Sequence, residues 1–291
     1  MIASVSLLAS LAGCADDPPG NAEDSGETGH DGPMLRVMID VSDSQARLDN
    51  AGQPVTTLPD GHAAQDPEFL LIAASTAELV PDEWTALGAG SRIFDSPRHE
   101  DVHDFGTLPN VTPGSELISV PLSSLEPGSF QYLRMSVAYQ RYRVEGRAEF
   151  MGTDVVSDIE IASFLDDALW IDDFEIGDQT ISVGGVKNQG YFAAWSQYTG
   201  VVQGQVPAGQ TTVPNPLDAT SPIPVGSCVV AGQFDTPLQI TGNETEDVVV
   251  HITMSSNQSF EWSDLNDDGK WQPYEEPVVD MGLRGMVLSV D

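Results

Sequence analysis

Basic residues are scarce in this sequence. Over 291 residues, 45 acidic side chains face 11 basic ones, which gives a formal net charge of −34, and lysine occurs only at Lys187 and Lys270. A surface of this sign repels the phosphates of nucleic acids and anionic lipid head groups, and it attracts cations. The composition therefore argues against nucleic acid as a partner and favours a cation as a ligand.

The signatures of several common catalytic and nucleotide-binding sites are also missing. The chain contains no G-x-S-x-G, no P-loop and no dinucleotide fingerprint. It has no repeat of fixed period, and its helical periodicity is weak. Hydrophobic residues still make up 40% of the composition, so a core can form in a chain long enough for one large or two modest domains.

Cysteine occurs twice, at Cys14 and Cys228. The apolar run Ile2–Leu11 precedes Cys14 and is too short to cross a bilayer as a helix, which takes about 20 residues. The tetrapeptide Leu11-Ala-Gly-Cys14 resembles the lipobox of bacterial lipoproteins, although no Lys or Arg precedes the run as signal peptides usually require. The resemblance implies a signal peptide over 1–13, a lipid on Cys14 that attaches the chain to a membrane, and a place in the bacterial cell envelope, at the outer membrane or cell surface.

Residues 14–33 are acidic, small and free of aliphatic clusters, so we expect a disordered tether between the lipid and a folded body. With Cys14 lipidated, Cys228 has no partner for an intrachain disulfide. We expect Cys228 to be a small buried residue on a strand.

From residue 34 to 291 the sequence has the patterns of β structure. Apolar and polar residues alternate, and Gly and Pro separate short runs, as is typical of strands. In the longest candidate, 130–145, alternation places Leu133, Met135, Val137 and Tyr139 on one face. We expect an all-β antiparallel β-sandwich or open barrel with long Pro/Gly-rich loops, one of them Val206–Pro224. This last loop could also join two β domains near residue 200, although one domain over 34–291 is preferred.

The other candidate strands are 34–41, 69–74, 116–122, 149–151, 159–164, 181–183, 191–197, 228–234, 248–254 and 286–290, and 163–170 could form a short helix. The segment from Pro127 to Val137 resembles the start of a strand in secreted β-sandwich lipoproteins of bacteria. That resemblance implies an extracellular β-sandwich and nothing finer.

The most specific motif lies in Asp264–Glu275, which matches D-x-[DN]-x-[DN]-G-x5-E at every specified position. The loop resembles that of the EF-hand family, so calcium is the expected cofactor. The resemblance implies six ligands: side chains of Asp264, Asn266 and Asp268, the carbonyl of Lys270, Gln272 directly or through water, and Glu275 as a bidentate ligand. Gly269 stands where the loop turns sharply.

The loop also departs from that family. Trp271 takes a position that is usually aliphatic, and Pro273 and Pro277 argue against a helix after the loop. We therefore expect strand–loop–strand, with calcium pinning the loop as a structural ion. An acidic surface turn remains the alternative, since Asp, Asn and Gly are also common in turns.

A second metal motif is His99-Glu-Asp-Val-His103, which fits H-E-x-x-H. On a helix its histidines could bind zinc, with Glu100 as general base of a hydrolase. The flanking Pro97 and Gly106 favour a polar surface loop instead.

Weaker candidates are the acid pairs Asp166-Asp167 and Asp172-Asp173, as a second calcium site or glycosidase couple, and five tryptophans that could stack on sugars. A solvated acidic face for the acid pairs and core or rim packing for the tryptophans are the preferred explanations.

The preferred function is therefore a non-enzymatic, lipid-anchored, calcium-binding β-sandwich of the cell envelope with a protein or glycan ligand or a structural role. A zinc-dependent hydrolase through residues 99–103 and a carbohydrate-binding module are the alternatives.

Overall fold

The computed structural model describes residues 32–55, 57–166, 169–206 and 229–291. The expected signal peptide, the lipidation site Cys14, nearly all of the tether, Cys228 and most of the Pro-rich loop Val206–Pro224 lie outside these ranges. Within the described part, Gly32–Asp291 groups as one compact unit.

The expectation of an all-β fold built on antiparallel sheets is confirmed. Apart from two 3₁₀ turns, η1 (Phe105–Thr107) and η2 (Leu122–Ser124), the elements are strands: β1 (Met34–Ser42), β2 (His62–Gln65), β3 (Glu68–Val80), β4 (Ser91–Asp95), β5 (Arg98–His99), β6 (Val102–His103), β7 (Ser115–Pro121), β8 (Gly128–Phe150), β9 (Thr153–Phe164), β10 (Leu169–Ile176), β11 (Gln179–Lys187), β12 (Tyr191–Ser196), β13 (Gly200–Gln205), β14 (Val229–Ile240), β15 (Val248–Ser255), β16 (Phe260–Ser263), β17 (Val278–Met281) and β18 (Met286–Val290). In these ranges no helix has the length and apolar character needed to cross a membrane.

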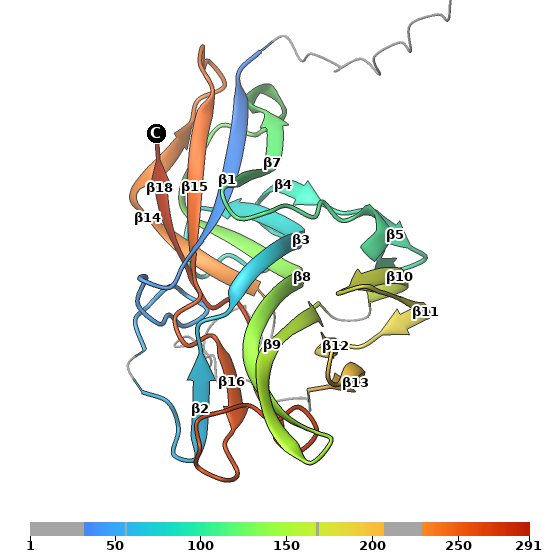
Figure 1. The fold of residues 1–291 in the computed structure, drawn as a ribbon. Coiled ribbons are helices and arrows are strands. Elements are labelled where there is room, and N and C mark those ends of the chain that lie inside the picture. Colours follow the sequence, from blue (N-terminus) through green and yellow to red (C-terminus); the bar gives the residue numbers. More distant parts are fainter. Residues whose placement is uncertain (1–31, 56, 167–168, 207–228) are drawn as a thin grey trace, which may run out of the picture. The chain divides into compact units, whose positions relative to one another are not determined.

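Two large sheets organise the strands. One has the order β18-β15-β1-β7, in which β1 and β15 run parallel and the other pairs are antiparallel. The other has the order β13-β12-β9-β8-β3-β4, with β14 paired to the first part of β8. The long strands β8 and β9 curve together along their paired length (Figure 1). A hairpin of β10 and β11, a short hairpin of β5 and β6, and a small sheet of β17, β16 and β2 complete the described fold.

The sheet that contains β8 and β3 is covered on both faces, which explains the long apolar runs in its strands. One core cluster joins β3, β8 and β14 to the sheet of β1 and contains Val37, Leu133 and Ile252. The second cluster joins β8, β9 and β12 to β10, with Phe164 and Ile171 at its centre. The two-layer arrangement expected for a sandwich therefore forms around the first cluster.

The prediction that four side chains of β8 share one face is correct from Leu133 to Val137 and wrong at Tyr139. Leu133, Met135 and Val137 lie in the first core cluster, whereas Tyr139 packs in the second. The cause is a β-bulge: Ala74 pairs with Val137 and Ala73 pairs with Tyr139, so one residue of β8 is extra. An extra residue reverses the alternation of side chains beyond it.

Two other sequence-based expectations are corrected. Residues 149–151 are not a separate strand, because β8 continues to Phe150 and Met151 and Gly152 turn the chain into β9 with φ values of 51° and 76°. The short helix expected over 163–170 is not formed by the described residues of that range, because Phe164 ends β9 and Leu169 begins β10; residues 167 and 168 lie outside the described ranges.

A buried ionic cluster joins β16 and β17 to the loop that precedes β2. Glu261 on β16 is fully buried and pairs with Arg47, and with His62 at 2.5 Å. Arg284, also fully buried, lies 2.8 Å from Asp280 and 3.9 Å from Glu261. Charges at this depth are tolerated because they are paired.

The cluster gives a testable dependence of stability on pH. Burial raises the pKa of Asp280 from 3.8 to about 6, against the opposing pull of Arg284. A carboxyl whose pKa is raised on folding stabilises the protein fully below its unfolded pKa, and this contribution is lost as the pH rises through the folded pKa. Between about pH 4 and pH 6 the wild-type protein should therefore lose stability relative to Asp280→Asn, by at most about 1.4 kcal/mol per pH unit. Urea unfolding of both proteins across this range measures the difference, and parallel curves would contradict the raised pKa.

Candidate metal-binding loop

The loop Asp264–Glu275 connects β16 to β17, which pair as antiparallel neighbours. The expected strand–loop–strand arrangement is thus present, and β17 follows the loop where a helix would follow in an EF-hand. The strand before the loop is β16, which the sequence analysis did not list; the predicted strand 248–254 lies one element earlier, in β15.

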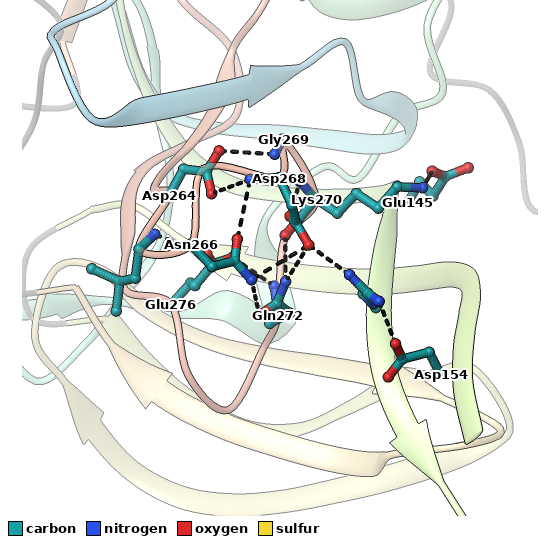
Figure 2. Close-up of polar contacts among 11 residues, drawn as sticks. Glu145, Asp154, Asp264, Asn266, Asp268, Gly269, Lys270, Gln272 and Glu276 are labelled. Carbon is teal, nitrogen blue, oxygen red and sulfur yellow. Dashed lines mark hydrogen bonds and ion pairs between the residues drawn. The ribbon is translucent and has the colours of Figure 1, made fainter. Parts of the chain in front are cut away.

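Side chains of the loop turn inward and bind its own backbone. The two carboxylate oxygens of Asp264 accept hydrogen bonds from the backbone N–H groups of Asp268 at 3.2 Å and Gly269 at 2.8 Å (Figure 2). Asp267 and Gly269 adopt φ values of 58° and 68°, and these two left-handed residues wrap the chain around Asp264. Left-handed backbone is costly for most residues and tolerable for Asp and Gly, which explains the residue types at both positions.

The carboxylate of Asp268 is the centre of the loop's polar contacts. One oxygen accepts from Arg147 Nη1 at 2.6 Å, Gln272 Nε2 at 3.1 Å and Asn266 Nδ2 at 3.4 Å, and the other accepts from the backbone N–H of Lys270 at 2.9 Å (Figure 2). Desolvation opposes ionisation here, but the bonds from Lys270 and Arg147 outweigh it and lower the pKa of Asp268. Asp268 is therefore held as an anion.

Arg147 brings the loop onto the sheet. It lies on β8, far from the loop in sequence, and its guanidinium bridges Asp268 of the loop and Asp154 of β9. Its backbone N–H donates to the carbonyl of Trp271 at 2.7 Å. A side chain on the preceding residue, Gly146, would collide with Ile159 and come within 3.3 Å of the Trp271 carbonyl, so glycine is needed there for the loop to dock.

Trp271, the departure from the EF-hand pattern, anchors the loop in the core. Its side chain is 1% exposed and packs edge-on against Phe260, with ring centroids 4.9 Å apart. Its indole N–H donates to the carbonyl of Glu276 at 3.2 Å. A larger apolar group than the usual aliphatic residue fills a place between β8 and β16.

Two adjacent glutamates differ in their positions. Glu275, the predicted bidentate ligand, is exposed. Glu276 is buried, and its carboxylate oxygens accept from the backbone N–H groups of Leu265 at 3.0 Å and Gln272 at 2.9 Å, which closes the loop (Figure 2). Burial raises the pKa of Glu276, with the charges of Asp264 and Asp268 acting in the same direction. The sequence analysis missed Glu276, although its position directly after a matched motif was visible.

The ligand atoms that the loop offers are oxygens, the type that a hard cation such as calcium prefers. Asp264, Asp268 and Glu275 supply carboxylates, and Asn266 and Gln272 supply amide groups whose oxygen and nitrogen exchange places on a half rotation. In the described ranges no group of three or more His, Cys, Asp or Glu side chains converges on one point. A complete shell here therefore depends on amide and backbone oxygens, and on a rotation of Glu275.

The H-E-x-x-H motif lies on a hairpin and not on a helix. His99 is on β5 and His103 on β6, with Glu100 in the turn at φ 55°. His103 pairs with Arg98 across the hairpin, which places the two histidines on opposite faces. His99 stacks on Trp170 at 4.0 Å, and His103 is buried with Nδ1 2.6 Å from Ser96 Oγ. This geometry does not present both imidazoles to one zinc ion.

The weaker candidates are dispersed. Asp166 contacts Ser75 and Ser136, Asp172 and Asp173 are exposed on β10, and Asp167 lies outside the described residues. Of the tryptophans, Trp84 is 55% exposed, whereas Trp262 and Trp271 are buried, so the five do not form one stacking row.

Comparison of the chain with protein families, curated proteins and solved structures found no match. The arguments about function therefore rest on the residues themselves.

Proposed function

We propose that residues 264–275 bind Ca²⁺ as a structural ion and that the protein is a non-enzymatic, calcium-stiffened β protein of the bacterial cell envelope. The observation that carries the proposal is the conformation of the loop. Side-chain oxygens of Asp264 and Asn266 both accept from the backbone N–H of Asp268, while Asp267 and Gly269 wrap the backbone around them. The envelope location and the lipid on Cys14 rest on the tetrapeptide Leu11–Cys14 alone.

Bound calcium would take the place of N–H donors as the partner of the Asp268 carboxylate. Half rotations of the Asn266 and Gln272 amides would exchange donors for oxygen ligands, and Arg147 would keep its contact with Asp154. The net charge of −34 favours cation binding at long range. Extracellular calcium sites bind at roughly 10⁻⁴–10⁻³ M, which suits a site that stiffens the fold and does not sense small changes.

Calcium should raise the melting temperature of the folded domain, and calcium at ten times Kd should add about 1.4 kcal/mol to the free energy of unfolding. Asp264→Asn and Glu275→Gln should each weaken or abolish this rise, since each removes a charged ligand. Thermal unfolding with calcium and with chelator measures the effect.

Two variants serve as controls. Asp267→Asn removes a charge from the same loop at an exposed position outside the six expected ligands and keeps a residue that tolerates left-handed backbone, so its calcium response should match wild type. Glu276→Gln should lower stability equally with and without calcium, because Glu276 binds loop backbone. An undiminished calcium response in both Asp264→Asn and Glu275→Gln would exclude the loop as its source.

A further inference from the structure

A cleft of about 260 Å³ lies where two strands part from the same edge of β8. β14 pairs with β8 as far as Ser136, and β9 pairs with it from Tyr139 onward, so the edge forks between these residues. Polar side chains from β3, β6 and β8, and that of Asp166 just after β9, meet at this fork. The cleft is separate from the loop 264–275, none of whose residues lines it.

A bulge in β3 directs a hydroxyl into the cleft. Ala74 and Thr76 pair with Val137 and Ser136, which leaves Ser75 as an extra residue on β3. Ser75 is fully buried and its Oγ donates to the carboxylate of Asp166, which Ser136 Oγ approaches at 3.5 Å. Bulges beside functional sites commonly re-aim a side chain in this way.

The lining of the cleft also carries an unusual share of the chain's positive charge. Three of the chain's 11 basic residues, Arg92, Arg98 and Arg134, line the cleft. Arg134 is buried and its guanidinium donates to the carbonyls of Thr85 and Glu83, which fixes it in place.

The other two arginines are partly exposed at the cleft and share one carboxylate, Asp95. Arg92 lies 3.1 Å from it and Arg98 lies 3.6 Å from it. The longer contact of Arg98, whose side chain is 44% exposed, leaves its guanidinium able to turn toward a ligand. His103 adds a mostly neutral imidazole, because burial lowers its pKa.

Charge and size limit the ligand. With Asp95 included, the three guanidiniums at the cleft face three carboxylates, so a singly charged ligand would bind by taking the place of Asp95 beside Arg98. A multiply charged anion is opposed by the net charge of −34. The carboxylate of Asp166 and the hydroxyls of Ser75 and Ser136 offer acceptors for ligand hydroxyls. The volume is below the roughly 300–1,000 Å³ of sites for drug-sized molecules.

We propose that this fork cleft binds a small hydroxylated monocarboxylate, such as a single sugar acid, with Arg98 and Arg92 on the carboxylate and Asp166 on the hydroxyls. Guanidinium groups pair with carboxylates through two parallel N–H···O bonds, which suits this division of roles.

The test is calorimetric titration of the folded protein with glucuronate and with gluconate, in chelator so that calcium bound by the acids or by the loop does not contribute. Saturable binding of at least one acid is expected, and neutral glucose should bind at least about tenfold more weakly. Arg98→Gln should weaken acid binding by about tenfold or more without changing thermal stability.

The matched control is Arg36→Gln. Arg36 is equally exposed, at 44%, and pairs with the surface acids Glu116 and Asp247, but it lies on β1 and does not line the cleft, so its variant should bind like wild type. No heat with either acid, equal binding of glucose, tighter binding of inorganic phosphate, or undiminished binding by Arg98→Gln would each overturn the proposal.

Discussion

Replacing Glu261 with alanine should lower the free energy of unfolding by about 3–5 kcal/mol, because removal of one partner from a buried ion pair leaves the other charges buried without compensation. Glu261 is fully buried on β16 and pairs with Arg47 and His62, with Arg284 3.9 Å away. Arg47 would then lose its carboxylate partner, and Arg284 would keep only Asp280 of the two carboxylates beside it. Equilibrium unfolding in urea at pH 7 measures the loss.

Glu68→Ala is the matched control for this substitution. Its side chain is 70% exposed and lies 3.6 Å from Arg143, so its removal should change stability by no more than about 1 kcal/mol. Glu261→Gln, which keeps hydrogen-bonding capacity but removes the charge, should fall between the two. A loss for Glu261→Ala as small as that for Glu68→Ala would contradict the role given to the buried cluster.

Replacing Trp271 with alanine should also cost about 3–5 kcal/mol, the range for removing a large aromatic side chain from a core. The indole is 1% exposed, packs on Phe260 and bonds to the carbonyl of Glu276, so the substitution leaves a cavity and frees the end of the loop. Trp271→Phe keeps most of the packing and should cost less. Urea unfolding in chelator separates this effect from any bound calcium.

Trp84→Ala makes the same chemical change on the surface. Trp84 is 55% exposed, and its removal should leave stability within about 0.5 kcal/mol of wild type. If Trp271→Ala were equally mild, Trp271 would not be the anchor that joins the loop to the core.

The sequence predicted much of the fold where the signal is local. Alternation of apolar residues located β1 and β7, and richness in β-branched residues located β15, each within a residue or two of the observed bounds. The same rule failed at Tyr139, because a bulge in the pairing of β3 with β8 moved that side chain to the other face. Short strands such as β16 and β17, with four residues each, carry too little pattern to be recognised.

The candidate sites likewise divide into features that depend on neighbouring residues, which were predicted, and contacts between distant segments, which were not. The residues that shape the loop, Asp264 and Gly269, were identified because an Asp side chain and a left-handed glycine act on backbone only a few positions away. Arg147 was not identified, because it lies 121 residues from Asp268. His99 and His103 had the spacing of a zinc motif, yet a two-residue turn between β5 and β6 separates their faces.

By itself the sequence determined the all-β character of the described residues, the turn residues Asp264 and Gly269 of the loop and a strongly acidic composition, because periodicity, turn residues and charge act between neighbours. Tertiary structure alone decided that Arg147 reaches Asp268, that Glu261 meets Arg47 and that Ser75 and Arg98 line one cleft. Those contacts depend on the register between segments far apart in the chain, and register is set by the packing of whole sheets.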